Sequence, residues 1–472
     1  MRFSRLLPVR LFFCLRDNLM SIRVFGGLIP ENVVRAATDA VTGEKSFLQN
    51  GQIIASGVGK VAVGTCVLLG DSRNDQHSTG TVIAYGNKRT KSAVHWLNWY
   101  NALSNQPINV LAKYAVSNTQ TSDLAGQVAS VLALPVLPQF AFIWTGVNDW
   151  SGSVTASVAA SNIADSCYLL GNAGITPVVF SESGTTAMTS VASITWLFEF
   201  NERLRDLADN NRKILLFDTG ATLWDPSAAT WSSTPVPNFK AGYLTDATHP
   251  GNLGGYNLGV AFGTWFSGRV TPFESRSSVL GEMVFANNPL ALIANGLFTT
   301  TTGGTSSGSG AVVGNVPASW NLAKGAAGSS TTISASAGSH GNDLSLVMTT
   351  GGADTIKLTQ DVAAGPKAAA AIGDILQAGA EIVVSAGTNL QGVNCIHEYN
   401  DGSASYTYID LYCQVASAGN GPQAYTATLQ PFPMTLSTTP SGWITTRLEW
   451  VFSGAGGATT LLRRAKFRKR IT

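Results

Sequence analysis

A serine at the end of a predicted strand is the first residue in this sequence that could do chemistry. The apolar, β-branched run from Val61 to Leu69 predicts a buried strand, and Gly70-Asp71-Ser72 follows it directly. Sheets of α/β proteins place ligands at the carboxyl ends of their strands. Ser72 could therefore be a nucleophile if a base and an oxyanion site exist, and Gly70 would let a substrate approach closely. Without those partners the tripeptide is an ordinary Ser/Asp turn.

A matching base stands much later in the chain. The segment Asp246-Ala247-Thr248-His249 places a carboxylate three residues before an imidazole. Pro250 biases His249 away from helix, so we expect it on a loop directly before a helix over Leu253 to Phe266. This presentation suits a general base and the acid that orients it. The alternative is an Asp/His turn that only caps the helix.

A third polar turn follows a second predicted buried strand. The run from Phe140 to Trp144 leads into Thr145-Gly146-Val147-Asn148-Asp149. The Asn148 side chain could donate a hydrogen bond to a developing oxyanion. An Asx-turn is the commoner role for asparagine after a strand, so both interpretations stay open.

Together these segments resemble the motif blocks of the SGNH (GDSL-type) esterases over roughly residues 60 to 266. Gly70-Asp71-Ser72 matches the first block, Gly146-Val147-Asn148-Asp149 the third and Asp246-Ala247-Thr248-His249 the last. The second block normally carries a glycine whose backbone N–H donates to the oxyanion. Its best match here is Ala115-Val116-Ser117-Asn118-Thr119, with Asn118 in the glycine's place, and asparagine tolerates unusual φ angles well.

The resemblance implies a three-layer, flavodoxin-like α/β fold with a mostly parallel sheet, and ester hydrolysis that needs no metal or organic cofactor. It assigns Ser72, Asp246 and His249 as catalytic residues. The oxyanion donors would be the backbone N–H groups of Ser72 and Asn118 and the side chain of Asn148.

Two neighbours of these blocks are candidate substrate-binding residues. Arg73 could contact an anionic sugar, but we favour an ion pair with Asp71 or Asp75, because adjacent opposite charges are common. Trp150 could stack on a sugar ring. Trp144 could do the same, although a tryptophan within a strand is more often part of the core.

Composition excludes several classes of protein. Hydrophobic residues make up 44% of the 472 positions and charged residues only 12%, with 49 glycines, which is typical of β-rich secreted or virion-type proteins. A net charge of +2 argues against a nucleic-acid partner. The five cysteines show no metal-binding spacing, so we expect no zinc site.

Two apolar stretches of the sequence could be a signal peptide or a membrane span, and neither has the required pattern. Arg10 interrupts the apolar N-terminus, so we predict no signal peptide. The uncharged stretch from Leu124 to Asn148 is split by Pro135 and Pro138, and we therefore expect no membrane insertion.

The chain divides into four predicted parts. Residues 1–60 are an N-terminal arm, with a short strand over Ile22–Phe25 and a weak helix over Glu31–Thr42. Residues 61–275 alternate strand and helix, which predicts a parallel sheet covered by helices. Residues 276–315 are a connector, since Thr299 to Asn315 has linker composition; the alternative is an extended segment pinned on a β-surface.

Residues 316–472 contain short runs rich in Thr, Val, Ile and Tyr between Gly/Ser/Asn turns, which predicts an antiparallel, jelly-roll-like β-sandwich. An esterase domain, a Gly/Thr-rich connector and a terminal sandwich in this order resemble bacteriophage tail-fibre or tailspike proteins that deacetylate surface polysaccharides. That resemblance implies a homotrimer on the virion tail, with other tail proteins and a bacterial surface polysaccharide as partners. The alternatives are a lipase, lysophospholipase or thioesterase of the same fold, and a non-catalytic receptor-binding fibre.

Overall fold

The computed structural model describes residues 12–16, 19–23, 35–38, 44–49, 52–58, 61–79, 88–104, 106–227, 238–270, 290–338, 341–413 and 419–470. These residues belong to two compact units, each built from several chain segments. The first unit comprises residues 1–71, 109–180 and 199–216, and the second comprises residues 72–108, 181–198 and 217–472.

The first unit is built on a five-stranded sheet in which the pairs β10–β11, β10–β6 and β6–β9 are parallel, which confirms the mostly parallel sheet predicted. Along the sheet the strands follow the order β12-β11-β10-β6-β9, so in chain order they stand 2-1-3-4-5, which is the flavodoxin-like arrangement. The order in which successive strands are added reverses beside β6, because β9 lies on one side of it and β10 on the other. Ligands bind at the carboxyl ends of the strands at such a switch point. The strands are β6 (Val61–Gly70), β9 (Asn109–Lys113), β10 (Leu137–Trp144), β11 (Thr176–Phe180) and β12 (Leu215–Phe217).

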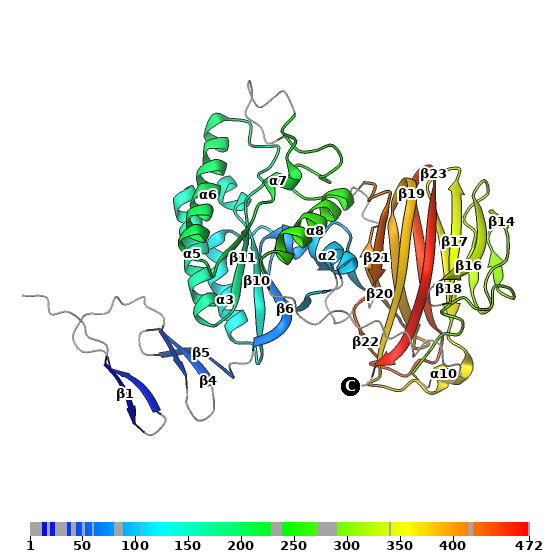
Figure 1. Ribbon diagram of the computed structural model, residues 1–472, viewed down its shortest axis with the longest axis horizontal. Coiled ribbons are helices and arrows are strands. Elements are labelled where there is room, and N and C mark those ends of the chain that lie inside the picture. Colours follow the sequence, from blue (N-terminus) through cyan, green and yellow to red (C-terminus); the bar gives the residue numbers. More distant parts are fainter. Residues whose placement is uncertain are drawn as a thin grey trace, which may run out of the picture. The chain divides into compact units, whose positions relative to one another are not determined.

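Helices follow these strands along the chain, because parallel strands need long crossover connections. In the first unit α3 (Leu124–Leu132) packs on β6 and α5 (Ala156–Asn172) packs on β11, as Figure 1 shows. Further helices are α6 (Val191–Asn210), α7 (Gly220–Leu223) and α8 (Asn252–Ser267). Between β6 and β9 the chain forms strand β8 (Lys88–Ser92) and then helix α2 (Trp96–Leu103).

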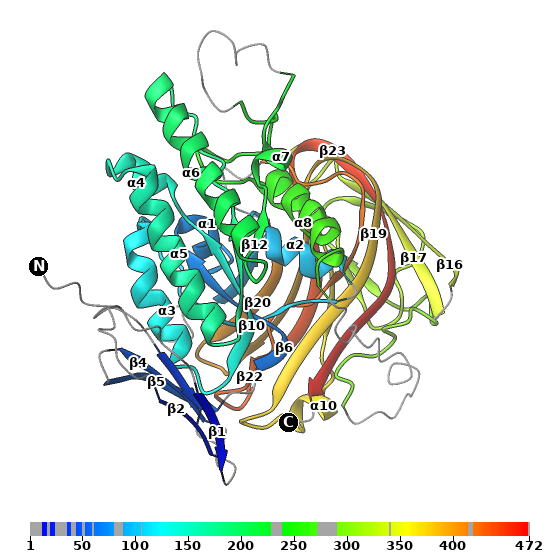
Figure 2. The same cartoon turned by 60° about the vertical axis from the view of Figure 1, so that its left-hand side comes forward.

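The second unit contains a 13-stranded sheet. Two strands, β19 (Ile375–Asn400) and β23 (Ile444–Arg470), pair along nearly their whole lengths and run side by side in Figure 2. One half of β23 pairs with β18 (Asp354–Asp361) and the other half with β17 (Gly341–Thr350). Register shifts between Glu381 and Gly392 separate the halves, and one apolar core packs against both. The predicted C-terminal β-rich region is therefore present.

The Gly/Thr-rich connector is pinned on this sheet, which was the alternative to a flexible linker. Strand β13 (Thr305–Ser307) pairs with β15 (Asn321–Ala323), and β14 (Ala311–Val313) pairs with β16 (Ser330–Gly338). The sheet thus includes residues that composition alone assigned to a linker.

Two strands of this sheet come from the segment of the chain between Ser72 and α2. Strand β8 pairs in parallel with β20 (Ser405–Tyr412), and β7 (Ser78–Thr79) pairs with β8. Lys91 in β8 donates a hydrogen bond to the carbonyl of Gln430 and lies 3.7 Å from a carboxylate oxygen of Asp410. The prediction of a separate sandwich missed this connection, because its partners are hundreds of positions apart in the sequence.

The N-terminal part contains β-hairpins. Strand β1 (Phe12–Arg16) pairs with β2 (Leu19–Arg23), and β4 (Glu44–Gln49) pairs with β3 (Arg35–Thr38) and β5 (Gln52–Val58). The weak helix predicted around residues 31–42 is wrong where β3 lies, because pairing with β4 overrides a weak local preference. No helix among the described residues is long and apolar enough to cross a membrane.

Candidate active site

The second unit brings together the three residues predicted to be catalytic. Ser72 begins the single-turn helix α1 (Ser72–Asp75) directly after β6. Its Oγ lies 2.7 Å from Nε2 of His249, and Nδ1 of His249 lies 2.8 Å from Oδ2 of Asp246. A hydroxyl, an imidazole and a carboxylate in one hydrogen-bonded line are the arrangement that activates a serine nucleophile.

Asp246 is held by its own loop. Its Oδ1 accepts hydrogen bonds from the N–H groups of Thr248 at 2.7 Å and His249 at 2.8 Å, while Oδ2 faces the imidazole. Partial burial raises the pKa of Asp246, but these backbone and ring hydrogen bonds together outweigh it, and its pKa lies below the usual value. The ionised carboxylate can therefore orient the imidazole and stabilise its protonated form.

The loop that carries His249 is short and pinned at both ends. The N–H of Thr245 donates to the carbonyl of His249, and the N–H of Gly251 donates to that of Tyr243. Helix α8 begins at Asn252, so His249 lies on a loop just before a helix, as predicted. The site is open to solvent, because 24% of the His249 side chain and 54% of the Asp246 side chain are exposed.

Gly70 allows the end of β6 to lie close to the backbone of β10. Its φ of 110° is in the region that favours glycine, and an added Cβ would lie 2.0 Å from the carbonyl oxygen of Trp144. The next residue, Asp71, donates its N–H to that same oxygen at 3.1 Å. The close neighbour that requires glycine here is therefore strand β10, and not a substrate as the sequence analysis expected.

The two asparagines predicted to serve the oxyanion lie in the first unit, in segments bonded to the end of β6. The Thr119 hydroxyl donates to the carbonyl of Gly70 at 3.0 Å, and Nδ2 of Asn148 donates to the carbonyl of Thr119 at 2.9 Å. An asparagine amide carries two N–H bonds, so Asn148 has a second one to offer. Asn118 has a φ of 66°, the left-handed conformation for which the sequence suggested asparagine was suited.

This conformation makes a prediction about Asn118. We expect Asn118→Gly to keep the stability of the protein, whereas Asn118→Val should lower its free energy of unfolding by about 1–2 kcal/mol, because left-handed backbone is unfavourable for a β-branched residue. Urea unfolding of the two variants beside the wild type measures the difference. Equal stability of the glycine and valine variants would show that this backbone conformation is absent.

Of the two roles considered for Arg73, the structure shows the favoured ion pair, here with Glu182, and its burial contradicts contact with a substrate. Its side chain is fully buried, and its guanidinium contacts both carboxylate oxygens of Glu182, at 2.5 and 2.8 Å. The sequence analysis missed Glu182, although it follows β11 as Ser72 follows β6 and Asn148 follows β10. Trp144 is buried in the core as favoured, whereas the sugar-stacking role of Trp150, half-buried on α4 (Val147–Ser151), stays a prediction.

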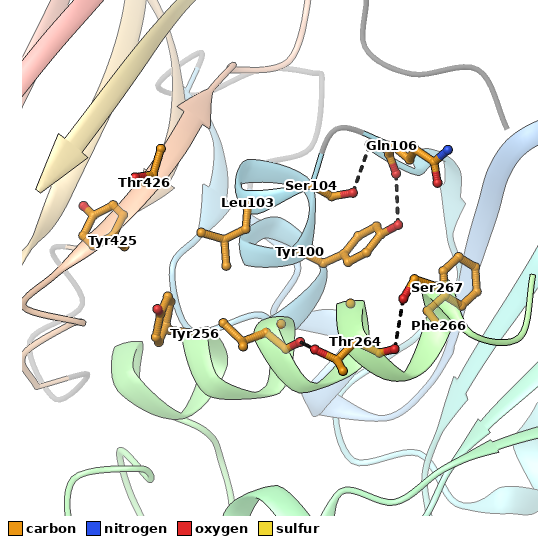
Figure 3. A pocket seen from close by; sticks show the side chains of 13 residues that line it. Tyr100, Leu103, Ser104, Gln106, Tyr256, Thr264, Phe266, Ser267, Tyr425 and Thr426 are labelled. Atoms are coloured by element: carbon orange, nitrogen blue, oxygen red, sulfur yellow. Dashed lines mark hydrogen bonds between the residues drawn. The ribbon is translucent and has the colours of Figure 1, made fainter. Parts of the chain in front are cut away.

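A cavity of about 380 Å³ lies elsewhere in the second unit, between α2, α8 and β21 (Tyr425–Leu429). Figure 3 shows Tyr100 and Leu103 extending from α2 toward α8. Neither Ser72 nor His249 lines it. Within the described parts of the chain, no group of three or more His, Cys, Asp and Glu residues could hold a metal ion.

No protein-family model and no curated protein matches this sequence. Among solved structures, a member of the lipolytic protein G-D-S-L family from Veillonella parvula is 14% identical with a TM-score of 0.31, covering 43% of this chain and 98% of that one. A mutant of Axe2, an acetyl-xylooligosaccharide esterase from Geobacillus stearmophilus, is 13% identical with a TM-score of 0.32, covering 46% and 98%. A structure of carbohydrate-binding modules from the β-sandwich superfamily is 11% identical with a TM-score of 0.24, covering 32% and 56%.

Proposed function

We propose that this chain is a serine ester hydrolase of the SGNH type, with Ser72 as nucleophile, His249 as general base and Asp246 as the acid that orients it. The observation that carries the proposal is the line of hydrogen bonds from Ser72 Oγ through the imidazole of His249 to the carboxylate of Asp246. Each group is within the distance over which a proton can pass or an imidazole can be oriented.

The reaction proceeds in two steps. Ser72 Oγ attacks the acyl carbonyl while His249 Nε2 takes its proton, and the tetrahedral intermediate collapses as His249 returns that proton to the departing alcohol. Water then attacks the acyl-serine, His249 accepts a proton from it, and the carboxylic acid leaves. Ser72 regains its proton from His249, so the enzyme is restored.

The oxyanion donors in this proposal are the backbone N–H groups of Ser72 and Asn118 and the side chain of Asn148. Two hydrogen bonds support this choice: Thr119 donates to the carbonyl of Gly70, and Asn148 donates to the carbonyl of Thr119. Gly70 stands two residues before Ser72 in the sequence. Each such donor contributes roughly 3 kcal/mol to the stability of the transition state.

For the substrate we propose an O-acetyl group on a bacterial surface polysaccharide. The exposure of His249 and Asp246 supports a bulky substrate, because a polymer can reach an open site without entering a tunnel. Acetate release from a panel of acetylated bacterial polysaccharides tests this choice. Cleavage of longer acyl esters alone would instead indicate a lipase-like enzyme, and no cleavage with retained glycan binding would indicate a receptor-binding fibre.

We further propose that the protein acts on a virion tail as a homotrimer, together with other tail proteins. This rests on the order of its parts, in which a β-rich region follows the α/β sheet. Light scattering of the purified chain tests the trimer, and a monomer mass would refute it.

Asp246 gives the proposal a graded test. We expect Asp246→Asn to lower kcat for an acetyl ester by about 10²- to 10³-fold, less than the roughly 10⁴-fold typical of a buried triad aspartate, because water can partly replace an exposed carboxylate. Steady-state kinetics on p-nitrophenyl acetate measure the change. Unchanged kcat would show that Asp246 is not part of the site. Asp225→Asn, a change to a half-buried loop aspartate outside the site, provides the control.

A further inference from the structure

The segment from Ser181 to Thr185 is irregular in conformation, yet each of its five residues is buried. It follows β11 and leads towards α6. Connecting segments usually lie on the surface, because a buried irregular segment must find partners for all its polar groups. Ser181 bonds to Thr219, and the carbonyl of Ser183 accepts from Trp224, while two further connections of the segment reach the two halves of the candidate catalytic site.

Its first connection reaches the nucleophile's turn. Both carboxylate oxygens of Glu182 accept hydrogen bonds from the guanidinium of Arg73, and neither side chain is exposed. The same carboxylate accepts the N–H of Gly184 at 2.8 Å, so its position is set from two sides. Arg73 is the residue next to Ser72, and bidentate pairs of this kind fix orientation as well as distance.

Its second connection reaches the loop of the base. The hydroxyl of Thr185 accepts a hydrogen bond from that of Thr248 at 2.9 Å, and the N–H of Thr186 donates to the carbonyl of Ala247 at 3.0 Å. Ala247 and Thr248 are the two residues between Asp246 and His249. One short segment therefore holds both the turn of the nucleophile and the loop of the base.

We propose that Glu182 is a positioning residue, and that residues 181–186 form a brace that sets the distance between Ser72 Oγ and His249 Nε2. The inference rests on the proposed hydrolase function. Ser72 and His249 stand 177 positions apart, and the base is partly open to solvent, so one hydrogen bond between them needs support from elsewhere. A displacement of about 1 Å can lower the rate of such a reaction about 100-fold.

The central experiment separates positioning from folding. Glu182→Gln leaves a buried guanidinium without its counter-charge and is expected to unfold more easily, whereas the double variant Arg73→Met, Glu182→Leu replaces the pair by apolar side chains, which buried sites often tolerate. We expect the double variant to melt near the wild-type temperature, with kcat for p-nitrophenyl acetate about 100-fold lower and KM within threefold.

Glu449→Gln provides the matched control. Glu449 is a buried carboxylate in the β-rich region, paired with Arg447 at 2.7 Å. Its loss should lower the melting temperature and leave kcat per folded molecule unchanged. A double variant that melts normally and retains wild-type kcat would overturn the brace.

A second pair of variants tests the other connection without touching the ion pair. Thr248→Val removes the hydroxyl that reaches Thr185, and Thr349→Val removes an exposed hydroxyl bonded to Ser330 in the β-rich region. We expect Thr248→Val to lower kcat three- to tenfold at an unchanged melting temperature, and Thr349→Val to change neither. Equal kcat in both variants would contradict the second connection.

Labelling with a fluorophosphonate distinguishes failure of the brace from failure of the proposed function. The rate at which the probe modifies Ser72, measured per folded molecule across pH, reports how well the base activates the serine. A wild type that is never labelled refutes the hydrolase and the brace with it. If the wild type, the double variant and Thr248→Val are all labelled at the same rate, the brace is refuted and the hydrolase proposal is not.

Discussion

Replacing Ser72 with alanine is expected to lower kcat for an acetyl ester by about 10⁴- to 10⁶-fold, the largest effect of any single change in this chain. The Ser72 hydroxyl is the only group in the hydrogen-bonded line that can attack a carbonyl. Without it, His249 could only activate a water molecule. The rate that remains should come from binding and from the oxyanion donors. Acetate release and p-nitrophenol release both measure the loss.

Ser130→Ala is the matched control. Ser130 is an exposed serine of α3 whose hydroxyl donates to the carbonyl of Gly126, and its loss should leave kcat at the wild-type value. Mass spectrometry after phosphonate treatment should find the adduct on Ser72 in the wild type and in this control. Full activity of the Ser72→Ala protein would mean that another residue is the nucleophile.

Acidification is expected to destabilise the β-rich unit through His397, well above the pH at which carboxylates protonate. His397 is fully buried in β19, where Nδ1 accepts the N–H of Ala378 and the ring stacks on Tyr408 and Phe467. Burial, helped by the charge of Lys91, lowers the pKa of His397 from about 6.5 to about 3.

The direction of the pH effect on stability follows from the proton bound at His397 in the folded and unfolded states. Between pH 6.5 and about 3 the unfolded chain binds a proton at His397 that the folded chain does not, so the free energy of unfolding decreases as the pH falls. The slope is about 1.4 kcal/mol per pH unit. Partial burial raises the pKa of Asp354, but hydrogen bonds from Ser329, Ala326 and Thr355 outweigh it, so the pKa lies below its usual value. Aspartates in the unfolded chain titrate near pH 4, so the range from pH 6 to 4.5 separates the histidine from these carboxylates.

Urea unfolding at pH 6, 5.25 and 4.5 measures that slope. His397→Asn keeps an acceptor for the Ala378 N–H and removes the titrating ring, so this variant should be less stable at pH 7 but should show a flat profile between pH 6 and 4.5. Parallel profiles for the wild type and the variant would mean that His397 is not the group that titrates.

Much of the catalytic layout could be predicted because its signals are local. Buried parallel strands are near-continuous apolar runs, so β6 and β10 are visible in the sequence, and the polar residues that follow each strand fall at one edge of the sheet. Glu182 met the same condition and could have been found in that way. Its partner could not, because nothing near residue 182 indicates an arginine 109 positions earlier.

The β-rich unit was harder to predict in detail for a related reason. The run Gly454-Ala455-Gly456-Gly457 has the composition of a turn, and the sequence analysis expected separate strands around it. In the structure β23 continues through it, and a Cβ on Gly456 would lie 2.2 Å from the carbonyl of Thr388 on β19. These glycines let two long strands approach each other, and only the partner strand distinguishes that use from a turn.

The pairing of β8 with β20 has a consequence for the timing of synthesis. Lys91 and Gln430, which bond to each other, are 339 positions apart. At about 5 to 20 residues per second, a ribosome needs roughly 20 to 70 s to make that stretch. The chain segment that follows Ser72 must therefore wait for the synthesis of residues 405–430 before it reaches its place. A nascent chain would therefore stay inactive until β20 and Gln430 have emerged from the ribosome.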